Sequence, residues 1–217
     1  MPSALENFIS QIRTSGVARP NRFSVEILTP ECMRSNQTPS IDSRLPELIN
    51  LYCQTASIPG QNIGVRDLRI TGPTYKRPVN IDYGGEGITF TFLVDGKLNI
   101  KSFFDIWMQK IIDPFQFQAN YDYGLDTYTT RIIINQINEV KFPVARGTRI
   151  LETTLETPFY RVVLENAFPR NIGMMELDQS SQSTAHKMSV TFAYRRLFHI
   201  SDMHTSAKYQ QIEASYQ

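Results

Sequence analysis

The run at residues 158–178, PFYRVVLENAFPRNIGMMELD, constrains the fold of this chain more than any other. Its first part alternates between two sets of side chains, Tyr160, Val162 and Leu164 on one face and Arg161, Val163 and Glu165 on the other. This period of two predicts a half-buried strand. We expect Phe168-Pro169 to stop the strand, because proline has no N–H for a sheet ladder, and Gly173 to turn the chain through a positive φ. The run predicts a β-corner.

Three further segments of distinctive sequence lie between the N-terminus and this run. The first, ARPNRFSVEI, opens with Ala18, Arg19, Pro20 and Asn21 and continues through Phe23 into a strand-like run. The second, CQTASIPG at 53–60, ends a strand at a proline before a long loop. The third, FDIW at 104–107, lies within an apolar helical stripe.

Taken together with the corner, these segments resemble the tube proteins of contractile phage tails over roughly residues 18–198. The resemblance implies a mainly β fold, an antiparallel β-sandwich flanked by one α-helix. In that family six copies join their sheets into a continuous barrel, and stacked rings form a conduit. The residues that carry the resemblance are expected to be structural: Ala18, Arg19, Pro20, Asn21, Phe23, Trp107, Phe168, Pro169 and Gly173.

The resemblance also implies a setting and partners. The chain would be a virion protein, assembled in the host cytoplasm, whose partners are copies of itself, tail sheath and baseplate proteins, a tape-measure protein and, transiently, phage DNA in the lumen. The composition fits, because 22 basic and 21 acidic residues give a formal charge of +1. A strongly cationic bore would hold DNA phosphates instead of letting them slide.

Other features exclude several classes of protein. No run of 18 apolar residues is present, and residues 1–6 lack the cationic start of an export signal, so we expect neither a membrane span nor secretion. Cys32 and Cys53 form no CxxC pair and are expected to be reduced thiols. We find no HExxH, GxSxG or GK[ST] motif, and the resemblance places Glu176 and Asp178 at the start of a strand. The sequence predicts neither an enzyme nor a metal or cofactor site.

We expect one domain over residues 1–217, since all-β units of this length commonly fold as one. It would comprise an N-terminal arm at 1–17 with a helix at 5–12, a core at 18–198, an inserted loop at 29–46 and a tail at 201–217. Strands are expected at 51–57, 78–83, 87–94, 129–138 and 186–197, with a hairpin-like excursion at 141–157. A helix at 99–112, capped by Asn99, would bury Trp107 in the core.

The loop at residues 60–80 carries the candidate contact residues Arg66, Arg69, Lys76 and Arg77. Loops this long in compact domains are usually functional or disordered. The resemblance favours an arm that reaches the next ring, and a solvated connector is the alternative.

Two related functions remain open. The extra segments at 29–46, 141–157 and after 200 would also suit a baseplate tube-initiator subunit of the same fold. A type VI secretion-like tube protein ranks behind both, because such proteins generally lack the ARPNxFxVEI opening. Strand alternation defines two sheet faces without indicating which one lines a bore.

Overall fold

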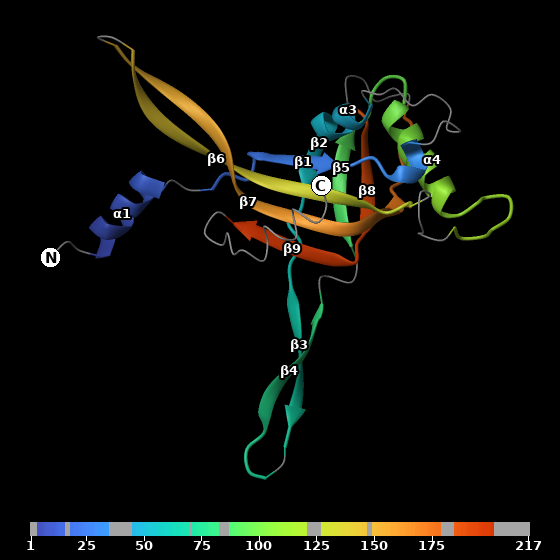
Figure 1. Ribbon diagram of the computed structural model, residues 1–217, viewed down its shortest axis with the longest axis horizontal. Helices are drawn as coiled ribbons and strands as arrows, with labels where there is room; N and C mark the ends of the chain where they lie inside the picture. Colours follow the sequence, from blue (N-terminus) through green and yellow to red (C-terminus); the bar gives the residue numbers. More distant parts are fainter. Residues whose placement is uncertain are drawn as a thin grey trace.

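The computed structural model describes residues 4–15, 18–34, 45–69, 71–82, 87–120, 127–146, 149–178 and 185–201 (Figure 1). The helices are α1 (Ala4–Ser15), α2 (Glu31–Arg34), α3 (Leu45–Tyr52) and α4 (Asn99–Ile111). The strands are β1 (Phe23–Ile27), β2 (Cys53–Ala56), β3 (Asn62–Leu68), β4 (Tyr75–Asp82), β5 (Ile88–Leu93), β6 (Thr130–Arg146), β7 (Arg149–Ile172), β8 (Lys187–Ala193) and β9 (Arg196–Ser201). Each strand pairing is antiparallel, which confirms the predicted mainly β, antiparallel class.

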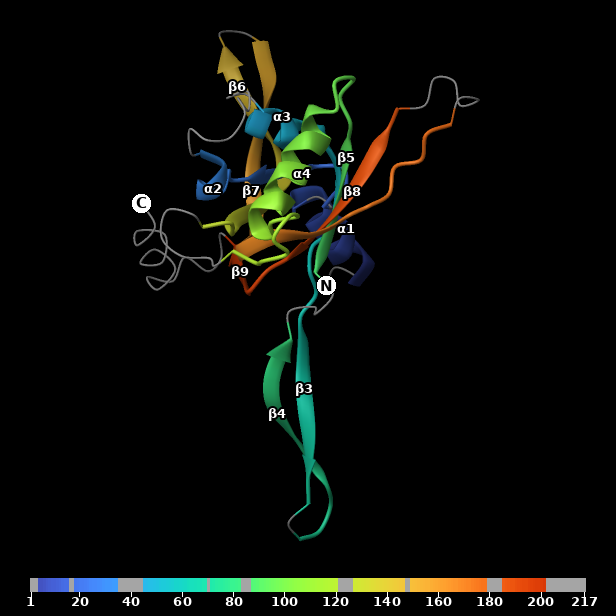
Figure 2. The same ribbon diagram turned by 90° about the vertical axis from the view of Figure 1, so that its right-hand side faces the viewer.

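Strand β7 belongs to two layers of sheet. The strands follow the order β1-β6-β7-β8-β5-β2, and β9 also pairs with β7. Up to Ala167, β7 pairs with β6 and β9, whereas from Phe168 to Ile172 it pairs with β8. The chain therefore crosses from the β1-β6-β7-β9 layer to the β7-β8-β5-β2 layer at this point (Figure 2).

The prediction that Phe168-Pro169 stops the strand is wrong, because β7 continues through both residues. The bend comes from Asn166, whose φ is 51°, and from irregular register on either side of it. Among the described residues, β7 pairs beyond Ala167 with β8 alone, so Pro169 lies on an edge strand, where proline is tolerated.

Gly173 also differs from its predicted role, since its φ is not positive. Its N–H donates to the Ser189 carbonyl at 2.7 Å, and an added Cβ would lie 2.1 Å from the Ser189 Oγ. Glycine is therefore favoured here by the close approach of two segments of the sheet, not by a turn.

The final strand predicted at 186–197 is two strands. β8 ends at Ala193, and β9 begins at Arg196 in the other layer. Between them the Arg195 N–H donates to the Glu165 carbonyl at 3.0 Å, which ties this bend to the bend in β7.

The core lies between the sheet and α4. Its centre is a group of fully buried aromatic rings whose neighbouring centroids lie 5.3–6.3 Å apart: Phe90, Phe92, Phe103, Phe104, Trp107 and Phe192. The predicted helix and the burial of Trp107 are confirmed. The predicted cap is wrong, because the Asp95 carboxylate, not Asn99, accepts from the Ile100 N–H at 3.2 Å.

Two short helices replace structure predicted as loop or strand. Within the predicted insertion at 29–46, α2 buries Cys32 and Met33. The helix α3 buries Leu45 and Ile49, one helical turn apart, and tolerates Pro46 in its first turn, where an N–H has no intrahelical partner. The predicted strand at 51–57 consequently starts at Cys53. Residues 35–44 of the insertion and 202–217 of the tail lie outside the described residues.

Candidate assembly surface

The predicted long loop is a two-stranded hairpin. β3 and β4 pair along their whole length and project away from the end of the β2–β5 pair (Figures 1 and 2). The connecting turn contains Gly72 at φ 88°, a conformation that glycine adopts without strain. Each residue of β4 is exposed, so the hairpin presents both faces outside the core.

The hairpin brings three of the four predicted cations into register. Arg66 lies directly opposite Arg77, and Lys76 lies opposite Asp67, while Arg69 follows the end of β3. Like charges directly across an antiparallel pair destabilise it. Neither guanidinium has an ion-pair partner among the residues that the structure describes. The pairing therefore places two like charges directly opposite each other on an exposed hairpin.

Exposed apolar side chains lie on the face of the hairpin opposite to Arg66 and Arg77, because side chains alternate along β3. Ile63 pairs with Ile81, Val65 pairs with Pro78, and Val79 lies at the irregularity between them. The four aliphatic side chains are each more than half exposed. Contiguous apolar surface outside a core is typical of a protein interaction site.

The sheet offers unpaired edges for further contacts. Within the described part of the chain, β1 and β2 end the strand order, and β9 pairs on one side, with β7. Edge strands present free N–H and C=O groups that another chain can pair with.

A polar ladder across three strands was missed by the sequence analysis. Asn135 is buried and donates to Glu26 at 3.1 Å and Ser24 at 3.3 Å, while the Arg161 Nε donates to the Asn135 Oδ1 at 3.0 Å. These bonds fix β1, β6 and β7 in register. In the sequence, the sign of this buried polar position is Asn135, which directly follows three isoleucines.

The signature residues at the start of the chain shape the approach to β1. Pro20 and Asn21 form a turn in which the Arg22 N–H donates to the Arg19 carbonyl at 3.2 Å. The Gln136 side chain donates to the same carbonyl at 2.8 Å, and Phe23 then packs against the core. Ala18 precedes this turn and is exposed.

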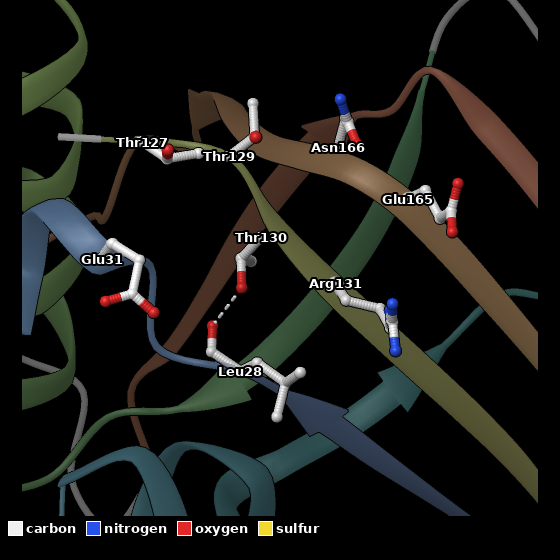
Figure 3. A pocket seen from close by; sticks show the side chains of 8 residues that line it. All are labelled: Leu28, Glu31, Thr127, Thr129, Thr130, Arg131, Glu165 and Asn166. Carbon is white, nitrogen blue, oxygen red and sulfur yellow. Dashed lines mark hydrogen bonds between the residues drawn. The ribbon is translucent and has the colours of Figure 1, made fainter. Parts of the chain in front are cut away.

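A shallow depression lies beside the bend in β7, lined by Leu28, Glu31, Thr127, Thr129, Thr130, Arg131, Glu165 and Asn166 (Figure 3). The Thr130 hydroxyl donates to the Leu28 carbonyl at 2.7 Å, and Glu31 accepts from Arg34 at 2.6 Å. No histidine, cysteine or serine lines it. Its polar lining is made of threonines, two glutamates, an arginine and an asparagine.

The described residues hold no group of His, Cys, Asp and Glu side chains arranged for a metal ion. None of the described helices has the length and apolarity needed to span a membrane. Cys32 and Cys53 are free thiols, as expected, and burial raises the pKa of Cys53 to about 12.

The chain is similar to one protein family in sequence and to several solved structures in fold. A family model described as phage tail tube protein matches residues 18–200. The anti-feeding prophage baseplate has a TM-score of 0.53 at 16% identity, over 85% of this chain and 96% of that chain. The sheath–tube complex of an extracellular contractile injection system (PVC) gives 0.51 at 16% identity, over 93% and 99%. The anti-feeding prophage tube-terminating cap gives 0.51 at 17% identity, over 85% and 91%. No curated protein matches the chain.

Proposed function

Because this chain belongs to the phage tail tube protein family, whose model matches residues 18–200, we propose that it is a structural subunit of a tail tube. Six copies form a ring, and rings stack into a conduit through which phage DNA passes during ejection. The observation that carries this proposal is the β3–β4 hairpin, which holds exposed apolar and cationic side chains away from the core.

Ring formation uses the open sheet edges. In a monomer such edges invite aggregation, whereas in a ring each edge pairs with the next copy. A head-to-tail contact between copies of one chain extends without limit along the stacking direction, which suits a tube. Arg66, Arg69, Lys76 and Arg77 are the proposed inter-ring contact residues.

The setting follows from this role. The subunit assembles in the host cytoplasm and resides in the virion tail, as one domain with its core at about 18–198. Its partners are the sheath, the baseplate, the tape-measure protein and, transiently, DNA. We propose a structural and not a catalytic role, which the match to the tail tube family supports.

A baseplate tube-initiator subunit is the second candidate. It is favoured by the long β6–β7 hairpin, which stays paired out to Arg146 and Arg149, beyond the paired part of β1. Initiators form a defined number of rings, whereas tube subunits elongate. The length distribution of assemblies from the purified chain separates the two.

Reversal of Lys76 and Arg77 to glutamate tests the role of the hairpin. We expect a folded, soluble subunit whose rings stack poorly, and we expect high salt to weaken stacking of the unmodified chain in the same direction. The double variant Lys97→Glu with Lys110→Glu changes net charge equally and should stack normally. Tubes of normal length from the hairpin variant at low salt would show that stacking lies elsewhere.

A further inference from the structure

The helix α1 presents an apolar face that the described body of the protein leaves in solvent. Leu5, Phe8 and Ile9 share one side of the helix, at positions i, i+3 and i+4, and are 65%, 58% and 41% exposed. Among the described helices and strands, none packs extensively against α1. A helix of 12 residues without tertiary packing is only marginally stable in water. The amphipathic sequence of α1 therefore suits a helix that docks on a partner.

A second exposed apolar surface follows α4, at residues 112–120, which we call the aromatic turn. Its two rings, Phe115 and Phe117, are 91% and 85% exposed. The turn is closed by an antiparallel bridge between Ile112 and Ala119. The Asp113 carboxylate accepts from the Phe115 N–H at 2.8 Å, and the Phe117 N–H donates to the Asp113 carbonyl at 2.8 Å. These bonds fix the backbone that carries both rings outside the core.

Phe117 also has an unfavourable backbone conformation. Its φ is 52°, in the left-handed region, where a bulky side chain is disfavoured and asparagine is tolerated. The ring is exposed, so it gains little burial within its own chain to offset this cost. Such conformations are found most often at sites of function. The position therefore suits a ring that contributes to a contact and not to the fold.

α1 and the aromatic turn lie at opposite ends of the molecule. β1 begins at Phe23, shortly after α1, and ends at Ile27, which pairs with Ile132 near the start of β6. At this second end, Trp107 of α4 donates to the carbonyl of Tyr128, just before β6. Figure 1 shows α1 on the left and the turn, in yellow-green beyond α4, on the right. A contact between the two surfaces therefore joins two copies.

Building on the self-assembly proposed above, we propose that the apolar face of α1 in one copy docks on the aromatic turn of a second copy. Leu5, Phe8 and Ile9 pack against the rings of Phe115 and Phe117, which removes both surfaces from water. Docking also gives α1 the tertiary packing that a short helix needs. Because each copy carries both surfaces at opposite ends, the contact is heterologous and repeats from copy to copy.

Cross-linking of paired cysteines tests this contact on the full chain. Ala4→Cys places a thiol beside the apolar face of α1, and Gln116→Cys places one between the two rings, both at exposed positions. Neither substitution removes an apolar side chain of the contact. The native thiols give little background, because Cys32 is buried and the raised pKa of Cys53 keeps it protonated at neutral pH. Assembled protein is treated with a short bis-maleimide and separated on a denaturing gel.

A mixture of the two single variants should give dimers, and the double variant should give trimers and higher species, while each single variant alone stays monomeric. Ala4→Cys mixed with Lys97→Cys, exposed just before α4, is the matched control and should give no dimers. Dimers from Ala4→Cys or Gln116→Cys alone would mean that like surfaces meet and would overturn the proposal. Normal tubes without linked species would overturn the docking and leave the tube function standing. Absence of any assembly from the unmodified chain would overturn the tube function itself.

Substitution within the two surfaces separates binding from folding. Phe117→Asn should leave the melting temperature of the unassembled subunit unchanged or raise it, because asparagine tolerates the positive φ. The same variant should raise the protein concentration needed for assembly by about tenfold or more. Phe8→Ser should weaken assembly similarly, and the double variant should be little worse than either single variant, since both remove one contact.

Leu51→Ser, which removes a leucine that is 78% exposed on α3, is the control for loss of exposed apolar surface and should assemble normally. A lower melting temperature of Phe117→Asn with normal assembly would assign the ring a structural role and overturn the proposal. Losses that multiply fully in the double variant would mean that Phe8 and Phe117 act in separate contacts, with the same consequence.

Discussion

The Nε1–H of Trp107 donates a hydrogen bond to the backbone carbonyl of Tyr128 at 2.8 Å, which joins the centre of α4 to the approach to β6. Trp107 is fully buried, with Phe103, Phe104 and Phe192 around it. The same residue therefore fills the core and satisfies a backbone acceptor at its margin. Two substitutions separate the contribution of core packing from that of the hydrogen bond.

We predict that Trp107→Ala lowers the free energy of unfolding by about 3–5 kcal/mol, because it leaves a cavity. Trp107→Phe keeps most of the volume and loses the hydrogen bond, at a cost of about 1–3 kcal/mol. Denaturant unfolding of both variants measures the difference. Since the chain has one tryptophan, its native emission maximum reports this site alone, and a maximum typical of water-exposed indole would contradict burial.

At the bend of β7, Phe168 packs edge-on against Tyr128, with ring centroids 5.7 Å apart. Phe168→Asp should give insoluble or unassembled protein, because it places a charge in this contact. Asn171→Asp, three residues further along the same strand and exposed, is the matched control. Soluble Phe168→Asp protein that forms normal assemblies would show that the bend does not depend on this packing.

The approach of Gly173 to Ser189 predicts a rescue. Gly173→Ala should destabilise the fold by about 1–3 kcal/mol, since its Cβ would lie 2.1 Å from the Ser189 Oγ. Ser189→Ala removes that oxygen, so the double variant should recover part of the loss, although the Ser189 carbonyl remains 3.2 Å away. Melting temperatures of the two single variants and the double variant test this, and strict additivity would refute a direct clash.

Stability should also fall in mild acid through His199. The Tyr160 hydroxyl and the His199 Nδ1 lie 2.5 Å apart, and burial lowers the pKa of His199 from its ordinary 6.5. The neutral imidazole is thus favoured in the folded state. Its contribution is complete above about pH 6.5, the ordinary value of the unfolded chain, and is lost as the pH falls through the lower folded value.

Melting temperatures measured from about pH 8 to about pH 5 should show this loss, and His199→Gln should flatten the profile across that range. A profile of unchanged shape in the variant would assign the acid sensitivity to other groups.

Local patterns predicted those elements whose burial repeats regularly. The stripe of α4 and the alternation in β5 read directly from the sequence because each has one side against the core. The bend between β8 and β9 was missed, although the buried positions change phase from Met188, Val190 and Phe192 to Leu197. α3 was missed because it is short and contains Pro46.

The candidate surface was predicted in composition but not in geometry. The four cations were identified, yet only pairing between β3 and β4 places Arg66 against Arg77. The path of β7 depends on contacts more remote in sequence, since this strand pairs with β6 and β9 up to Ala167 and with β8 from Phe168. Such long-range pairing leaves no periodic signature in one sequence.

Negative-stain electron microscopy of the purified, unmodified chain tests the central claim most directly. The account predicts closed rings with a central lumen in end views and hollow stacks of such rings in side views, at low salt and across a range of protein concentrations. Particles that remain single subunits throughout that range, or filaments with no lumen, would contradict it.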